Sequence, residues 1–485
     1  MTFLWHDYET FGINPRQDRP AQFAAIRTDE QLNEIGEPLM LYCRPAPDYL
    51  PDPVSCLITG ITPQHCLEHG LPEYQFAARI EKELAASGTI GVGYNTIRFD
   101  DEVTRFMFWR NLIDPYAREW QNGCGRWDLL DVVRTAYALR PDGIEWPVNA
   151  DGMTSFKLEH LSAANGLSHE SAHDALSDVR ATIALARLVR EKQPKLFDFC
   201  LALRRKDRVA QELRLPVTQD SARPFLHISG MFSPERGCMA IMWPLATHPV
   251  NRNELLAWDL SADPSELVGL NSEEIRARLF TRTDDLPEGV TRLPIKGVHL
   301  NKSPIVISHL KTLSPQMAER WGIDVAQAMA HALKAQELPD MSAIWAEVYA
   351  RDASMPQPDV DGDLYGGFLG DEDRRRLQRV RQMTPQELAA ERLGFDDERL
   401  MELVWRYRAR NYPETLSAEE KQGWHQHCMG RLLNGAGASR TIAQVQDQID
   451  ALSMEREERE DEQAMRDMQV LEAVYDYAHS LVEEE

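Results

Sequence analysis

Residues 3–11 open the chain as a short apolar strand that leads into two carboxylates. Their sequence is Phe-Leu-Trp-His-Asp-Tyr-Glu-Thr-Phe, so one residue separates Asp7 from Glu9. Side chains alternate along a strand, which places both acids on the same face. Neighbouring carboxylates resist ionising together, and a bound divalent cation removes that cost. The same pattern is also typical of an ordinary strand that ends in a solvated turn.

Length and composition exclude several classes of protein. A chain of 485 residues exceeds the size of a single hydrophobic core, so roughly two to four domains are expected. The absence of a run of about 18 apolar residues, and of a basic segment followed by an apolar one at the start, predicts a cytoplasmic protein without a membrane span. The seven cysteines are scattered and form no Cys-x-x-Cys pair, which argues against disulfides and a zinc site. Any metal should therefore have oxygen ligands.

The net charge of −24 argues against a polyanionic ligand, because nucleic-acid affinity comes largely from Lys and Arg. The charge is unevenly distributed, however. Acidic residues gather at 455–462 and 483–485, whereas arginines gather at 204–208 and 406–410. Each of these runs is also typical of a solvated helix face.

The pattern of elements after the first strand predicts an α/β domain. Two strands, a helix and a further strand are expected over residues 21–28, 38–43, 73–86 and 89–94. Between them, residues 57–63 form an apolar segment broken by Gly60. We interpret this segment as a turn from a strand into a helix that Thr62 caps, with Pro63 in its first turn. Alternating strands and helices are typical of α/β proteins.

Two further acidic sites follow along the chain. Asp100 comes after the strand at 89–94, where ligands often bind in open sheets, and it is also placed to cap a helix that runs to Leu112. His173 precedes a helix for which Asp174 is the expected N-cap and in which Asp178 lies about one turn from the start. A histidine before a helix is more often a surface or capping residue.

Four carboxylates that converge on one place require two divalent cations, which is the apparatus for displacement at phosphorus. Asp7-Tyr8-Glu9, residues 95–100 and residues 173–178 match, in order, the three motifs of the DEDD 3'-5' exonucleases, and the histidine spacing resembles the DEDDh branch. The chain is also similar to the bacterial exodeoxyribonuclease I family in further segments, at 6–12, 19–27, 126–131 and 407–413.

The resemblance implies three domains. These are a ribonuclease H-like exonuclease domain with a mixed sheet over residues 1–193, an SH3-like β-rich domain over 194–355 and a C-terminal helical domain over 356–485. The sequence agrees in outline. Short apolar runs occur at 225–230, 239–245, 255–260 and 295–300, and helical patterns occur at 371–382, 384–393, 397–410 and 442–478.

The motif match also implies a mechanism. Asp7, Glu9 and Asp178 would hold the metal that binds the attacking water, Asp7 and Asp100 would hold the metal at the leaving 3'-oxygen, and His173 would take the proton. The reference pKa of histidine, near 6.5, suits a general base. Two Mg²⁺ ions fit a site made of oxygen ligands, with Mn²⁺ as a substitute. The expected reaction is hydrolysis of single-stranded DNA to 5'-mononucleotides.

The family further implies binding sites for the strand end and for a partner. The candidates for contact with the terminal nucleotide are Glu9, Thr10, Phe11, Thr59, Gly60 and Ile61. Packing roles are an open alternative for Phe11 and Ile61. The C-terminal tail of single-stranded DNA-binding protein is the expected partner, with Arg140 on one side of its pocket, and the chain is expected to be a monomer.

Two alternative functions share these motifs. An RNA-trimming or proofreading exonuclease differs in substrate but not in chemistry. The other alternative is a DNA-binding scaffold whose nuclease is silent. The presence of all five catalytic residues argues against it, because a degenerate site need not keep them.

Overall fold

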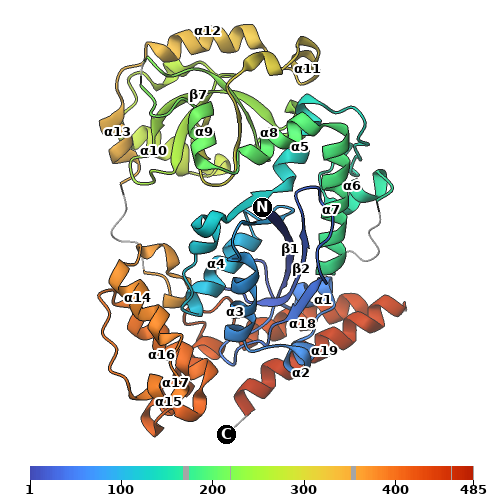
Figure 1. The fold of residues 1–485 in the computed structure, drawn as a ribbon, viewed down its shortest axis with the longest axis vertical. Coiled ribbons are helices and arrows are strands. Elements are labelled where there is room, and N and C mark those ends of the chain that lie inside the picture. The colour runs from blue at the N-terminus through green and yellow to red at the C-terminus, as the bar shows by residue number, and fades with distance from the viewer. Residues whose placement is uncertain (168–173, 219, 351–356, 460, 484–485) are drawn as a thin grey trace. The chain divides into compact units, whose positions relative to one another are not determined.

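The computed structural model describes residues 1–167, 174–218, 220–350, 357–459 and 461–483. The chain forms two compact units (Figure 1). One consists of Met1–Gly125, His169–Arg180 and Pro356–Glu485, and the other of Arg126–Ser168 and Ala181–Met355.

The first unit is built on a mixed sheet with β1 at its centre. Its strands are β1 (Thr2–Thr10), β2 (Pro20–Thr28), β3 (Leu39–Tyr42), β4 (Thr89–Gly93) and β5 (Gly125–Asp128), in the order β3-β2-β1-β4-β5. The pairs β1–β2 and β2–β3 are antiparallel, whereas β1 and β4 are parallel. The expected mixed sheet is thus confirmed. Since β1 has a partner on each side, its course is fixed over most of its length.

Helices follow the strands in the manner of an α/β domain. They are α1 (Pro53–Thr59), α2 (Pro63–His69), α3 (Glu73–Leu84), α4 (Asp100–Arg110), α5 (Leu129–Leu139), α6 (Leu158–Ala164) and α7 (Ala175–Lys192). The stripe of Phe76, Ala77, Ile80 and Leu84 on α3 is buried against Tyr8 of β1 and residues of α4. This apolar layer holds α3 and α4 on the sheet.

Two local predictions were wrong. Residues 57–59 belong to α1, which begins at Pro53 because the Asp52 side chain accepts a hydrogen bond from the backbone N–H of Val54. Asp100 is the first residue of α4 and not its cap, since the N-cap position is held by Phe99. The prediction of Thr62 as the cap of α2 is confirmed, because its hydroxyl accepts from the N–H of His65.

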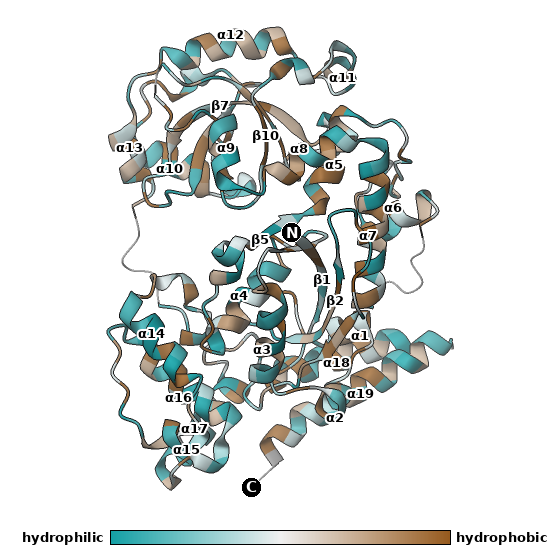
Figure 2. Ribbon diagram, viewed as in Figure 1, coloured by the Kyte–Doolittle hydropathy of each residue, from teal (hydrophilic) through white to brown (hydrophobic). Residues whose placement is uncertain are grey.

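The C-terminal part of this unit is helical, as expected. It contains α14 (Asp371–Val380), α15 (Pro385–Ala390), α16 (Arg399–Asn411), α17 (Ala418–Asn434), α18 (Ile442–Glu457) and α19 (Glu462–Glu483). α17 was not predicted, and the expected single helix over 442–478 is two helices. α18 and α19 pack on α1 and α2 from the start of the chain (Figure 1). Hydrophilic and hydrophobic residues are mixed along both, as in amphipathic helices (Figure 2).

The second unit contains an antiparallel sheet in the order β10-β6-β7-β8-β9. Its strands are β6 (Phe225–Ile228), β7 (Met239–Thr247), β8 (Glu254–Asp259), β9 (Ile295–His299) and β10 (Ile305–Ile307). The first four were predicted, and β10 was not. Besides α5, α6 and the later part of α7, this unit contains six further helices: α8 (Pro194–Ala202), α9 (Lys206–Glu212), α10 (Ser272–Phe280), α11 (Pro315–Arg320), α12 (Val325–Gln336) and α13 (Ser342–Val348).

None of the helices in the described ranges is long and apolar enough to cross a membrane. All seven cysteines are buried free thiols. This agrees with the sequence analysis, which argued against disulfides.

Candidate active site

β1 places Asp7 and Glu9 on the same side of the central strand. In the antiparallel pairing with β2, Asp7 lies opposite Ala24 and Glu9 opposite Gln22. The register shifts directly after Glu9, between Glu9 and Thr10. The two acids therefore belong to the last regular part of the β1–β2 pairing, beyond the pairing with β4, which ends at Trp5.

The start of α7 brings Asp178 to this strand. The Asp174 carboxylate accepts a hydrogen bond of 3.3 Å from the N–H of Ser177, and so caps the helix as predicted. The side-chain oxygen of Gln22 accepts a further hydrogen bond of 3.3 Å from the N–H of Ala175. The first turn of α7 is thereby attached to β2, beside the strand that carries Asp7.

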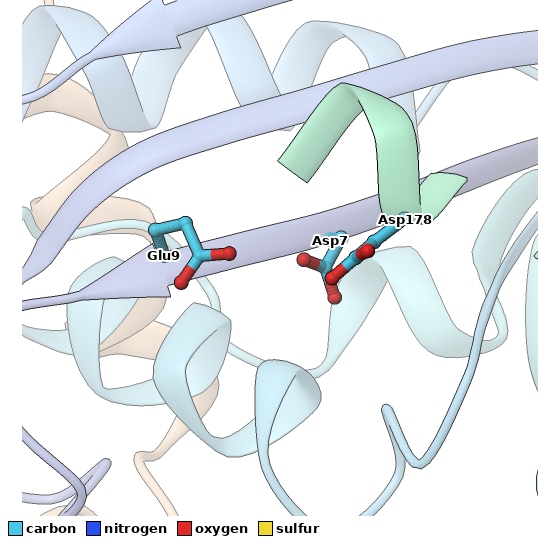
Figure 3. Close-up of side chains that lie close together, drawn as sticks. All are labelled: Asp7, Glu9 and Asp178. Carbon is cyan, nitrogen blue, oxygen red and sulfur yellow. The ribbon is translucent and has the colours of Figure 1, made fainter. Parts of the chain in front are cut away.

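Asp7, Glu9 and Asp178 form a compact acidic cluster (Figure 3). One carboxylate oxygen from each lies within 4.8 Å of the others. The side chain of Glu9 is buried, and those of Asp7 and Asp178 are half-buried. Three ligand oxygens at this spacing fit the coordination of a hard divalent cation.

Asp100 approaches the same strand from α4. Its carboxylate accepts a hydrogen bond of 3.0 Å from the backbone N–H of Tyr8, the residue between the two acids of β1. The hydroxyl of Thr104 in turn lies 3.0 Å from the Tyr8 hydroxyl and donates to the backbone carbonyl of Asp100 at 2.8 Å. The start of α4 is thus held against β1, and the Asp100 side chain is buried there.

The electrostatics of the cluster are those of a cation site. Burial raises the pKa of Asp7 well above its usual value, and the neighbouring charges that raise it further belong to Asp100, Glu9, Asp178 and Asp174. Burial also raises the pKa of Glu9 to about 8, with added repulsion from Asp178, Asp100 and Asp174. A cation would remove this repulsion, because it favours the ionised form of every carboxylate around it. The donor set therefore fits divalent metal.

The other predicted residues lie in different surroundings. His173 is outside the described residues. The Phe11 side chain is 1% exposed and Ile61 is 8% exposed, and both belong to one hydrophobic cluster. The Thr10 hydroxyl donates to the carbonyl of Gly12 at 2.7 Å. The Thr59 hydroxyl, 3.0 Å from the carbonyl of Ser55, accepts from the N–H of Ile61 at 3.2 Å. The segments at 10–11 and 59–61 thus meet through the packing of Phe11 and Ile61.

Arg140 follows α5 in the second unit. Its guanidinium donates to the backbone carbonyls of Leu139 at 2.5 Å and Thr312 at 3.3 Å. These bonds orient the side chain but do not neutralise its charge.

Two residues near the cluster were not recognised as site residues from the sequence. Asp174 was predicted only as a cap, yet its charge also raises the pKa of Asp7 and Glu9. Gln22, which holds the start of α7, was not singled out. The sequence did contain a signal for this role, because Gln22 is a polar residue within the apolar strand 20–26. A buried amide needs hydrogen-bond partners, so such a residue is expected to bind a neighbouring element.

Comparison with known proteins identifies the class of protein to which this chain belongs. Residues 4–186 match a family model described as exonuclease, residues 204–351 match the exonuclease I SH3-like domain, and residues 358–481 match the exonuclease I C-terminal domain. The sheet, the acidic cluster and these matches define a hydrolytic nuclease of the exonuclease class.

Individual relatives narrow this class to one family. Exodeoxyribonuclease I of Escherichia coli K12 is 47% identical over 88% of this chain and 89% of its own length. The zinc-bound E. coli exonuclease I complex with single-stranded DNA has a TM-score of 0.90 at 43% identity, covering 99% of this chain and 100% of its own. An exonuclease I complex with SSB-Ct has a TM-score of 0.90 at 42% identity, covering 99% of each chain. The chain belongs to the exodeoxyribonuclease I family.

Proposed function

We propose that this protein degrades single-stranded DNA from the 3' end and releases 5'-mononucleotides, in DNA repair and recombination. The observation that carries the proposal is the cluster of Asp7, Glu9 and Asp178, with Asp100 held against the same strand. This cluster lies in a chain that is similar over 99% of its length to an exonuclease I bound to single-stranded DNA.

The residues of the cluster would bind two divalent ions. Asp7, Glu9 and Asp178 would hold one divalent ion, and Asp7 and Asp100 would hold a second. When bound, such ions lower the pKa of water and stabilise the charge that develops on the phosphate. His173, which precedes α7, acts as the general base and takes the proton of the attacking water. The bond broken joins the last phosphate to the 3'-oxygen of the penultimate nucleotide, and that oxygen leaves with the remaining strand.

The family and the oxygen ligands support divalent-metal dependence, and we infer that Mg²⁺ is the ion used. Mg²⁺ binds through a few carboxylates and keeps several waters, which suits a site open to a phosphate. Mn²⁺ has similar ligand preferences and should replace it. The seven cysteines supply no competing soft site, since all are buried thiols with no thiol pairing in the described chain.

We further infer the three domains at 1–193, 194–355 and 356–485, and a cytoplasmic location. Glu9, Thr10, Phe11, Thr59, Gly60 and Ile61 would line the site for the terminal nucleotide. The acidic tail of single-stranded DNA-binding protein would dock beside Arg140. Replacing Arg140 with Ala should weaken binding of a tail peptide and leave hydrolysis of free single-stranded DNA unchanged.

The function is tested with one sequence prepared as single-stranded DNA, duplex DNA and RNA. The wild-type protein with Mg²⁺ should release 5'-mononucleotides fastest from the single-stranded DNA. The D7A and H173A variants should still bind the strand and release no mononucleotide. Faster hydrolysis of RNA would establish the RNA-trimming alternative, and no hydrolysis of any substrate would establish a silent scaffold.

A further inference from the structure

Arg440, in the loop before α18, connects the C-terminal helices to two segments of the exonuclease domain. Only 13% of its side chain is exposed. Its Nη1 donates to the carbonyl of Leu50 at 2.8 Å and to the Asp18 carboxylate at 3.1 Å, and its Nη2 donates to the Asp52 carboxylate at 3.4 Å. One half-buried cation therefore bridges two carboxylates from separate parts of the domain.

The Asp18 side of this bridge leads to the turn after β1. The Tyr49 hydroxyl lies 3.0 Å from the Asp18 carboxylate and 3.0 Å from the backbone carbonyl of Phe11. The other oxygen of Asp18 accepts from the N–H of Asn14 at 2.9 Å. A Cβ at Gly12 would lie 2.2 Å from the same carboxylate, so the turn is closed tightly around it. Asp18 thus fixes the backbone that follows Thr10.

The Asp52 side leads to α1. The Asp52 carboxylate caps this helix through the N–H of Val54 at 3.0 Å, and its own N–H donates to the carbonyl of Phe11 at 2.8 Å. α1 has seven residues and ends at Thr59, where its C-cap is Gly60, whose φ of +70° is in the left-handed region. So short a helix depends on its caps, because few of its hydrogen bonds are internal. The position of the turn at 59–61 therefore depends on Asp52.

We propose that Arg440 is a positioning residue for the terminal-nucleotide site of this exonuclease. The inference rests on the proposed function and concerns only how the segments at 10–11 and 59–61 are held. Without the guanidinium, Asp18 and Asp52 lose their shared cation, and buried carboxylates are costly when uncompensated. Both segments would then loosen together. The acidic cluster would keep its own supports, which are the β1–β2 pairing, the Gln22 contact to α7 and the Asp100 contact to Tyr8.

The matched control is Arg456, which pairs with Asp467 at 2.9 Å between α18 and α19. Its side chain is 16% exposed, close to the value for Arg440, and its guanidinium bonds to Leu452, Glu455 and Asp467 of this helical pair. An R456M variant removes a comparable ion pair from the C-terminal helices without touching Asp18 or Asp52. Comparing R456M with R440M therefore separates a general loosening of the C-terminal helices from the loss of the bridge between Arg440, Asp18 and Asp52.

The experiment measures KM and kcat for single-stranded DNA, and inhibition by a 5'-mononucleotide, for wild-type, R440M, R440K and R456M proteins. R440M should raise KM and the inhibition constant about tenfold with kcat within about twofold, the pattern of lost ground-state binding. R440K should recover part of the loss, because it retains the charge, and R456M should resemble wild type.

An unchanged KM in R440M, or an equal rise in R456M, would overturn the inference. A wild-type protein that releases no mononucleotide would instead overturn the proposed function. In that case mononucleotide binding, measured directly by calorimetry in all four proteins, still decides whether Arg440 positions a nucleotide site.

Discussion

The backbone N–H of Tyr8 donates a hydrogen bond of 3.0 Å to the carboxylate of Asp100, which lies 92 residues further along the chain. This bond holds the acid at the start of α4 against Tyr8, the residue that separates Asp7 from Glu9 in β1. The carboxylate thus has two roles that can be separated experimentally, one in structure and one in metal binding.

Replacing Asp100 with Asn should abolish hydrolysis while retaining the fold. The amide oxygen can still accept the bond from Tyr8, but a neutral amide is a much weaker ligand for a hard cation. Replacing Asp100 with Ala also removes the acceptor, which should cost about 1–3 kcal/mol in unfolding free energy. Activity assays and chemical denaturation of both variants separate the two roles. Wild-type activity in the D100N variant would show that Asp100 is not a metal ligand of the site.

The repulsion within the acidic cluster predicts that D7N stabilises the metal-free protein. The substitution removes an acid whose pKa is raised by burial and by neighbouring carboxylates, which means that its ionisation is costly in the folded state, and no cation is lost in the absence of metal. The midpoint of thermal unfolding without metal should rise by about 2 °C, the size expected for roughly 1 kcal/mol. Added Mg²⁺ should stabilise the wild-type protein but not the D7N variant. The exposed Asp151, changed to Asn, is the control and should behave as wild type in both conditions.

Gly93, at the end of β4, should be intolerant of substitution. A Cβ at this position would lie 2.1 Å from the Thr96 side chain and 2.6 Å from the carbonyl of His6. An alanine there must displace the loop that leads to Asp100, so both activity and stability should fall in the G93A variant. Gly91 in the same strand is the control, since its nearest neighbour would be 3.2 Å away. Equal losses in G91A and G93A would show that the effect comes from β4 as a whole.

The sequence predicted β1, α3 and the cap of α7 correctly because their signals are local. Alternation of polar and apolar residues, a helical stripe and a capping aspartate are each visible within a short window. The helix at 53–59 was missed because its signal, Asp52 followed by Pro53, was outweighed by the apolar run that follows. The two helices over 442–483 were predicted as one, because their pattern is helical on both sides of the break.

The motif positions predicted which acids form the cluster, but nothing local in the sequence predicted what holds them. The supports from Gln22 to α7 and from Tyr8 to Asp100 join residues that are 92 or more positions apart. Such pairs depend on how the elements pack, and a single sequence contains no record of that packing. The charge pattern had the same limit, since Arg406 and Arg410 of the run at 406–410 proved to be partners of the buried Asp361 and Asp48.

The buried Asp48 predicts how stability depends on pH. Burial alone would raise the pKa of this carboxyl, but the charge and hydrogen bonds of Arg410 and the charge of Arg431 outweigh it and hold the pKa well below its usual value. Asp48 therefore stays ionised when folded and takes up a proton only on unfolding, near pH 4. Its contribution is fully present above that pH and is lost as the pH falls toward the folded-state value.

The D48N variant should lose about 3–5 kcal/mol at pH 7, because Arg410 and Arg431 are left without their shared partner. Its stability should also fall less steeply than that of wild type between pH 5 and pH 3. Urea denaturation across this range measures both effects. Asp207, whose carboxylate pairs with Arg205 and is 56% exposed, provides a D207N control that should change neither. Parallel pH curves for wild type and D48N would refute the assignment.

The central claim is that carboxylates from distant parts of the chain form one site for two divalent ions. Anomalous diffraction from crystals soaked in Mn²⁺ tests it most directly. The account predicts one peak among Asp7, Glu9 and Asp178 and a second beside Asp7 and Asp100. Ions bound only elsewhere, with these four side chains lacking metal at saturating Mn²⁺, would contradict it.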